Sequence, residues 1–327
     1  SWIGNNAIAV AAFGYLVILL PIADSPGVHL AGQVLLIWAM FGLNLLGPKN
    51  IARFQSLCVV FGLLPVAAIL VAGWAHFDPD VYRAGWNVSG RADAAAAIGS
   101  LATVFWAFIG LETGAMVAGV VRDPDRNVPI ATLAGIVLAG VVYLVSSVLM
   151  MGIVPVADLA GSSAPFALVA GKMFGAWAVP LIAAAAALKA TGTLGGWMLV
   201  TGESGVRAAQ RGFLPAVFGH VRGNGAATTG LLIVVVLMSL IAFTTLSESV
   251  SNQFVAIINM AVTLVVMAYV AAGLSLMFGT RERPPTSSDR LVGMGALLAC
   301  GLLIWSTPVQ TLVGGLVIAL LAWAAYR

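Results

Sequence analysis

Residues 130–153 read IATLAGIVLAGVVYLVSSVLMMGI, a stretch without a charged side chain. At a rise of 1.5 Å per residue, a helix over this range is about 36 Å long, and the hydrocarbon core of a bilayer is about 30 Å thick. The stretch is therefore typical of a transmembrane helix. Continuously apolar runs lack the alternation of barrel strands, so the sequence predicts an all-helical protein.

Apolar segments of the same kind precede and follow this one along the chain. Reading apolar runs against polar breaks predicts ten membrane spans. Their approximate bounds are 1–21, 29–46, 55–75, 95–120, 130–153, 176–206, 229–246, 252–279, 291–306 and 308–326.

The composition agrees with a polytopic membrane protein. Of the 327 residues, 61% are hydrophobic and only 8% are charged, whereas a soluble domain carries about 25% charged residues. This composition excludes a soluble enzyme and a nucleic-acid binder. The two cysteines, Cys58 and Cys300, lie in or beside apolar runs, which excludes a disulfide scaffold. The loops between the spans are too short to form a separate soluble domain.

The basic residues predict the orientation of the chain, because cytoplasmic loops carry an excess of Lys and Arg. One set of alternate loops holds only Arg83, Arg91 and Lys172. We therefore expect the opposite set to be cytoplasmic, together with the C-terminus. That set holds Lys49, Arg53, Arg122, Arg126, Arg207, Arg211, Arg222, Arg281, Arg283, Arg290 and Arg327.

Glu112 and Trp106 lie at membrane depth in one glycine-containing span. An intramembrane carboxylate is costly and therefore a functional candidate, although Glu112 could instead serve as a hydrogen-bonded link between helices. Gly110 and Gly114 flank it, and such glycines permit an unwound segment whose backbone groups bind a ligand. The indole of Trp106 attracts ammonium groups, although a tryptophan at this place could also face lipid or pack against a neighbouring helix.

Lys189, Thr193 and Trp197 are spaced by four residues and therefore share one helix face. Gly192, Gly195 and Gly196 leave room there for a neighbouring helix. Lys189 could pair with a carboxylate, carry a proton or stand as a fixed cation where related folds bind sodium. Simple structural pairing is the alternative.

Two further polar side chains at membrane depth admit both a functional and a structural role. Asn5 could hydrogen-bond a ligand or link helices, and Tyr269 could form a gate or pack.

A phosphate loop, a His-Glu-x-x-His motif and paired cysteines do not occur in the sequence. We therefore expect no enzyme activity, cofactor or metal, and transport driven by gradients.

The stretch FWAFIGLE (105–112), followed by GVVRDPDRNVPIAT (119–132), resembles the amino acid/polyamine/organocation superfamily. Within it, the likeness is strongest to the basic amino acid/polyamine antiporter branch, and it continues through LGGW (194–197) over essentially the whole chain. The resemblance implies a fold of two inverted repeats of five helices followed by two C-terminal helices. In the loop before residue 130, it implies Asn127 as a helix cap and Pro129 in the first turn.

Alignment by motif places the first span of this chain as the third helix of the family. Ten of the twelve helices are then expected, without the first two, and the sequence as given is not expected to transport. Residues 1–75 would form the remainder of the first repeat, residues 95–279 the second repeat and residues 291–327 the two C-terminal helices.

The resemblance also assigns roles to individual residues. Trp106 would stack on the substrate, and the backbone around Trp106 and Ile109 would bind its α-amino group. Trp197 would close the path to the cytoplasm. The remaining assignments are Glu112 and Tyr269 in the outer gate, Glu112 and Lys189 in proton coupling, and Ser1, Asn5 and Ala261 around the basic end of the substrate, where Ala261 replaces an expected hydroxyl.

These assignments favour an exchanger of a cationic amino acid for its decarboxylated amine, working by alternating access in a bacterial inner membrane. One alternative is a proton-coupled amino acid symporter in which Lys189 replaces a sodium ion. Another is a sensor or truncated partner protein that binds ligand without moving it. The expected partners are the substrate, the lipid bilayer and, as in relatives of the branch, a second copy in a homodimer, but no nucleic acid.

Overall fold

The computed structural model describes residues 2–20, 22, 25–110, 123–244, 249–279, 284–309 and 311–315. Within these ranges the chain is helical, and its β structure is limited to one isolated bridge between Val221 and Ala227. The prediction of an all-α protein is confirmed. In chain order the elements are α1 (Trp2–Val17), α2 (Pro26–Asn44), α3 (Pro48–Ala72), η1 (Gly73–His76), α4 (Pro79–Gly85), α5 (Asp93–Trp106), α7 (Pro124–Ile153), α8 (Val156–Gly161), α9 (Pro165–Phe174), α10 (Ala178–Gln210), η3 (Ala216–Gly219), α11 (Thr229–Thr244), α12 (Val250–Phe278) and α13 (Ser287–Ser306).

Six of the described helical segments are long and apolar enough to cross a membrane: α2, α3 with η1, α7, α10, α12 and α13. The helices α1, α5, α9 and α11 are apolar but shorter. Each of the first nine predicted spans contains a helix. The predicted span 308–326 lies mostly outside the described residues.

Two helices begin at least six residues earlier than hydropathy predicts, and both begin at a proline. Helix α3 starts at Pro48 rather than at residue 55, and α7 starts at Pro124 rather than at residue 130. The predictions of Asn127 as a cap and of Pro129 in the first turn are wrong, because Asp123 is the N-cap residue of α7 and both residues lie further inside the helix, which begins at Pro124. The pyrrolidine ring fixes φ near its helical value, which suits a proline to the first helical position.

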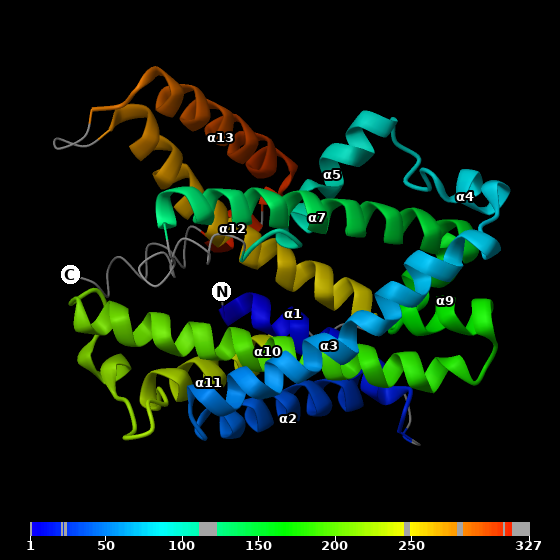
Figure 1. Cartoon of the computed structure of the whole chain (residues 1–327), viewed down its shortest axis with the longest axis horizontal. Helices are drawn as coiled ribbons and strands as arrows, with labels where there is room; N and C mark the ends of the chain where they lie inside the picture. The colour runs from blue at the N-terminus through cyan, green and yellow to red at the C-terminus, as the bar shows by residue number, and fades with distance from the viewer. Residues whose placement is uncertain are drawn as a thin grey trace.

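Helix α1 lies in the interior of the helix assembly, between α10 and α12 (Figure 1). Most of its side chains are buried. The most extensive contact in the described part of the chain joins α3 to α10, and glycines of α10 make it close. A Cβ on Gly192 would overlap Cβ of Cys58, and one on Gly196 would overlap the side chain of Gln55. The prediction that the α10 glycines admit a neighbouring helix is therefore confirmed.

A chain of buried amide side chains connects three helices. Gln253 of α12 donates to Oε1 of Gln33 over 3.2 Å, and Gln33 of α2 donates to Oδ1 of Asn6 over 3.3 Å. All three residues are at most 2% exposed. Because a buried amide needs a hydrogen-bond partner, this chain links α1, α2 and α12 through specific partners as well as through apolar packing.

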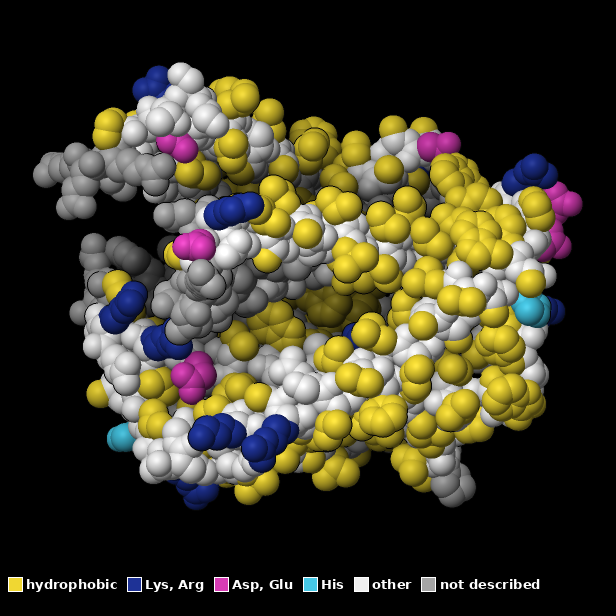
Figure 2. Space-filling model, viewed as in Figure 1, with side chains coloured by type: hydrophobic (Ala, Val, Ile, Leu, Met, Phe, Trp, Pro, Cys, Tyr) yellow, Lys and Arg dark blue, Asp and Glu magenta, His cyan; other side chains and the backbone are white. Residues whose placement is uncertain are grey.

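The outer surface of the helices is strongly apolar. Side chains such as Leu35, Val71 and Trp305 are 70 to 83% exposed, which suits a surface that faces lipid rather than water. Figure 2 shows hydrophobic side chains over most of this face, whereas basic side chains gather mainly at the edge where Figure 1 places the connection between α10 and α11. The protein is thus a multi-pass membrane protein.

Candidate functional site

The predicted span 95–120 is not one continuous helix. Helix α5 ends at Trp106, and residues 107–110 form turns in which the N–H groups of Ala107, Phe108 and Ile109 donate to carbonyls three residues earlier. Gly110 then adopts a φ of 112°, a conformation that favours glycine. The unwound segment predicted beside Gly110 is confirmed within the described residues.

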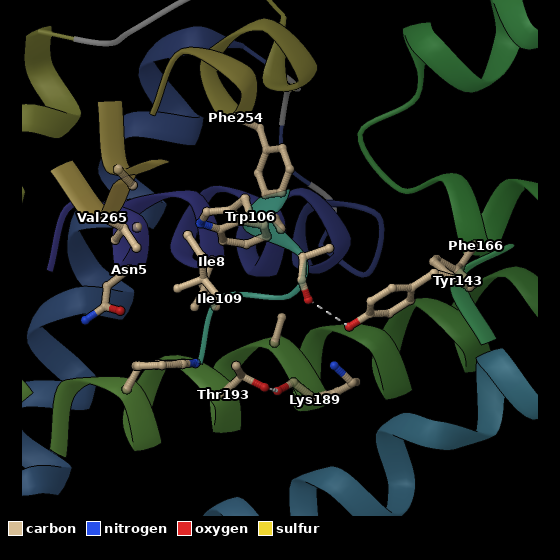
Figure 3. Close-up of a pocket in the computed structure, with 16 residues that line it drawn as sticks. Asn5, Ile8, Trp106, Ile109, Tyr143, Phe166, Lys189, Thr193, Phe254 and Val265 are labelled. Carbon is tan, nitrogen blue, oxygen red and sulfur yellow. Dashed lines mark hydrogen bonds between the residues drawn. The ribbon is translucent and has the colours of Figure 1, made fainter. Parts of the chain in front are cut away.

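A cavity of about 520 Å³ lies against this break in α5. It is lined by residues of α1, α5 and its following turn, α7, α9, α10 and α12. Most of the lining is apolar or aromatic, which is typical of a site for a small ligand. Figure 2 shows the face of the molecule hollowed between α7 and α10, and Figure 3 shows the lining side chains.

Trp106 forms one wall of this cavity, and its ring is held from two sides. The ring lies edge-on to Phe254 of α12, with centroids 5.4 Å apart and an interplanar angle of 81°. A Cβ on Gly4 of α1 would lie 3.3 Å from Nε1 of the indole, so the glycine lets the ring approach α1. Trp106 therefore lines the cavity (Figure 3).

The predicted face of α10 forms the opposite wall. Lys189, Thr193 and Trp197 all line the cavity, which confirms that they share one face. The Thr193 hydroxyl donates to the carbonyl of Lys189 over 2.9 Å and is satisfied within its own helix. The Trp197 ring lies against the turn after α5, since a Cβ on Gly110 would be 2.5 Å from Cζ2 of that ring.

The structure brings together most of the residues predicted to bind substrate. Asn5, Trp106, Ile109, Trp197 and Ala261 all line the cavity. Asn5 is 1% exposed, and within the described part of the chain its Nδ2 has no hydrogen-bond partner. This amide is therefore a buried donor beside the cavity.

Of the residues predicted for the outer gate, the structure describes only Tyr269, and it does not line the cavity. Tyr269 lies outside the lining and packs edge-on against Phe105, with centroids 5.7 Å apart. Glu112 and Ser1 lie outside the described residues, so their predicted roles stay predictions.

Sequence reasoning missed three aromatic residues of the cavity: Phe254, Tyr143 and Phe166. Phe254 precedes Ala261 by seven residues, two helical turns, and this spacing would have placed it on the same face of α12. Tyr143 and Phe166 gave no such signal, because they come from α7 and from a short helix in a predicted loop.

Hydrogen bonds fix both of these residues. The hydroxyl of Tyr143 donates to the carbonyl of Ala107 in the broken segment over 3.2 Å, a contact drawn in Figure 3. The backbone N–H of Phe166 donates to the hydroxyl of Tyr15 over 3.4 Å. The turn after α5 and the start of α9 are thus each attached to a tyrosine of another helix.

This chain belongs to the amino acid permease family, which it matches over residues 1–323. The relatives it resembles are transporters of basic amino acids and polyamines, as the sequence motifs indicated. It is 36% identical to the cadaverine/lysine antiporter of Escherichia coli K12 over 282 residues, which cover 85% of this chain and 64% of the antiporter. It is 30% identical to the putrescine transporter PotE of the same strain over 328 residues, 99% of this chain and 75% of PotE.

Proposed function

We propose that the protein is a secondary active transporter that exchanges a cationic amino acid for its decarboxylated amine by alternating access. The observation that carries this proposal is the position of Trp106, at the end of a broken helix and in the wall of a cavity within a membrane protein. An indole face in a site that excludes water binds a cation with about 2 kcal/mol or more. Binding of this strength is reversible, and a transporter must release its substrate.

The proposed roles of individual residues follow the family likeness and the geometry of the cavity. Trp106 stacks on the cargo, and the backbone from Trp106 to Ile109 takes the α-amino group, because the C-terminal end of a helix carries partial negative charge. Trp197, against Gly110, closes the path to the cytoplasm. Glu112 and Tyr269 form the outer gate, and Glu112 and Lys189 are the candidates for proton coupling.

Asn5, Ser1 and Ala261 surround the basic end of the cargo in this proposal. The amide of Asn5 is buried, and its carbonyl oxygen can accept a hydrogen bond, whereas Ala261 offers a methyl group where a guanidinium would need a further acceptor. A guanidinium has five N–H donors, and a primary ammonium has three. Lysine or ornithine and their diamines are therefore better suited to this end than arginine and agmatine.

The arrangement of the chain extends this proposal. Residues 1–75 and 95–279 form parts of two inverted repeats, and residues 291–327 form an appended helix pair. The carrier lies in a bacterial inner membrane with the C-terminus in the cytoplasm, and forms a homodimer.

Reconstitution into liposomes tests the exchange. Uptake of radiolabelled lysine, ornithine or arginine is measured into vesicles that contain cadaverine, putrescine or agmatine, or no amine. In a protein that carries both repeats in full, we expect uptake that depends on the internal amine and is fastest for lysine or ornithine. Uptake that is the same without internal amine would contradict exchange.

A second candidate, proton-coupled symport, is favoured by Lys189. This lysine is half-buried in the cavity wall and has no ion-pair partner among the described residues. A proton on Lys189 could serve where related folds hold sodium. Symport requires only an imposed proton gradient, so uptake into amine-free vesicles with a gradient distinguishes it from exchange.

A further inference from the structure

Gln33 of α2 lies outside the cavity but is bonded to two of the helices that form its walls. None of the described residues of α2 is in the cavity lining. The amide of Gln33 donates to Oδ1 of Asn6 over 3.3 Å and accepts from Nε2 of Gln253 over 3.2 Å. Asn6 directly follows Asn5, and Gln253 directly precedes Phe254. Because Asn5 and Phe254 both line the cavity, each bond ends one residue away from a wall.

These bonds fix the rotation of α1 and α12 about their own axes. Consecutive residues of an α-helix point about 100° apart. When the amide of Asn6 faces α2, Asn5 is turned towards the cavity, and the same holds for Gln253 and Phe254. A side chain ends about 6 Å from the helix axis, so a rotation of about 10° moves it by about 1 Å. That displacement exceeds the tolerance of about 0.5 Å within which binding groups must be held.

Apolar packing between α1 and α12 sets this rotation less tightly than the amides do. Buried side chains of both helices, among them Ile3, Ala7 and Ile258, belong to one apolar cluster. Apolar attraction is non-directional, and apolar cores lose a unique arrangement before they lose stability. A satisfied network of buried polar groups specifies one arrangement. The amide chain therefore supplies the directional interactions that the apolar contact lacks.

The rotation of these two helices also affects Trp106. Phe254 of α12 lies edge-on to the indole, with ring centroids 5.4 Å apart. Gly4 of α1 lies against the same ring, since a Cβ there would be 3.3 Å from Nε1 of the indole. A rotation of either helix would thus displace a neighbour of Trp106, as the arrangement in Figure 3 illustrates.

We propose that Gln33 is a positioning residue of the cargo site. Its bond to Asn6 sets how α1 presents Asn5. Its bond to Gln253 sets how α12 supports Trp106. The proposal rests on the proposed function, since it concerns the same cavity. Gln33 does not touch the cargo, and its loss changes the placement of residues that do, in addition to the stability of the protein.

Fluorine NMR of the full chain in detergent, labelled with fluorotryptophan, tests this placement without a ligand. The signal of Trp106 is assigned by its absence from Trp106→Leu. The test variant is Gln33→Met, because methionine nearly keeps the volume of glutamine and has no amide. The matched control is Asn44→Leu. Asn44 is an amide of the same helix, 3% exposed, and it donates to the main-chain carbonyls of Met40 and Gly195, which do not line the cavity.

We expect Gln33→Met to move the Trp106 signal by more than its width and Asn44→Leu to leave it in place, although each variant lowers the unfolding midpoint. An unchanged signal in folded Gln33→Met, or an equal change in both variants, would overturn the positioning role. Gln253→Met, which removes only the bond to α12, replaces Gln33→Met if that variant does not fold.

Equilibrium binding of lysine and cadaverine to the same proteins tests the consequence for the cargo. We expect Gln33→Met to weaken binding about tenfold and Asn44→Leu to change it less than about twofold. In an Asn5→Ala/Phe254→Leu background, Gln33→Met should weaken binding by less than about a further twofold, because the residues through which it acts are gone.

An equal loss of affinity in both backgrounds would overturn the positioning role and leave the proposed function in place. A wild type that binds neither lysine nor cadaverine would overturn the proposed function and, with it, the role of Gln33 in a cargo site, whatever the NMR result.

Discussion

At the scale of single residues, Trp106 combines a cavity on one face of its ring with neighbours that fix the ring in place. Phe254 packs edge-on against the indole, and Gly4 leaves space for the indole nitrogen. A fixed ring loses little entropy when a ligand binds, so this tryptophan is preorganised for a cation.

Trp106→Leu should weaken binding of lysine by at least about tenfold, because leucine keeps an apolar wall but has no π face. The measurement is equilibrium binding to purified protein. Trp305→Leu is the matched control, since Trp305 is 83% exposed on the outer surface. Equal affinities of Trp106→Leu and the wild type would remove Trp106 from the site.

The family resemblance, together with the polar groups at membrane depth, predicted Asn5, Trp106, Lys189 and Trp197 as site residues, and all four line the cavity. Polar groups and glycine breaks are rare at membrane depth, so each of them is informative. Phe166 could not be predicted in this way, because aromatic residues are common in apolar helices. Its place depends on how α9 docks, which the hydrogen bond to Tyr15 reports and the local sequence does not.

At the scale of secondary-structure elements, the contact between α3 and α10 depends on residues without side chains. Gly192 packs against the side chain of Cys58, and Gly62 packs against the side chain of Lys189. Close approach of this kind increases van der Waals contact between helices, which is a principal source of their association in lipid.

Gly192→Ala should therefore destabilise the protein by about 1 to 3 kcal/mol through overpacking. Gly205→Ala is the matched control in the same helix, because a Cβ on Gly205 would lie 3.8 Å from Phe218, an ordinary contact. The measurement is the thermal unfolding midpoint in detergent. We expect Gly192→Ala to lower this midpoint by several degrees and Gly205→Ala to leave it near the wild-type value.

The buried amides give a second prediction at this scale. Gln33→Leu removes the middle of the chain and leaves Oδ1 of Asn6 and Nε2 of Gln253 without the partners shown. The expected cost is about 1 to 3 kcal/mol for each buried group.

A double-mutant cycle checks the coupling between these amides. Gln253→Leu should cost less in the Gln33→Leu background than in the wild type, because its partner is already gone. Purely additive losses in unfolding free energy would show that the two amides do not act together.

The elements themselves were largely predictable from hydropathy, but their ends were not. An apolar run marks the part of a helix that lies in lipid, whereas Pro48 and Pro124 start helices among polar residues outside that run. Helices α4, α8 and α9, of 7, 6 and 10 residues, lie in predicted loops because they are too short to cross a membrane. The break after Trp106 was predictable, because glycine permits the positive φ of 112° that Gly110 adopts.

At the scale of the whole molecule, the distribution of basic residues predicts which end faces the cytoplasm. We expect Arg83→Cys to react with a membrane-impermeant maleimide from the outside of intact cells, and Arg211→Cys to react only after permeabilisation. Arg83 is 76% exposed in its pair with Asp80, so its loss costs little. Cys58 and Cys300 are buried and give a low background. Labelling in the reverse order would show that the orientation is wrong.

The hydrogen bond from Tyr143 has a consequence for mutational tolerance. Its acceptor is the main-chain carbonyl of residue 107, an oxygen that every amino acid supplies. The codon for residue 107 can therefore change without loss of the acceptor atom. The information for this bond between α7 and the broken segment resides in the codon for residue 143, where a change as small as tyrosine to phenylalanine deletes it.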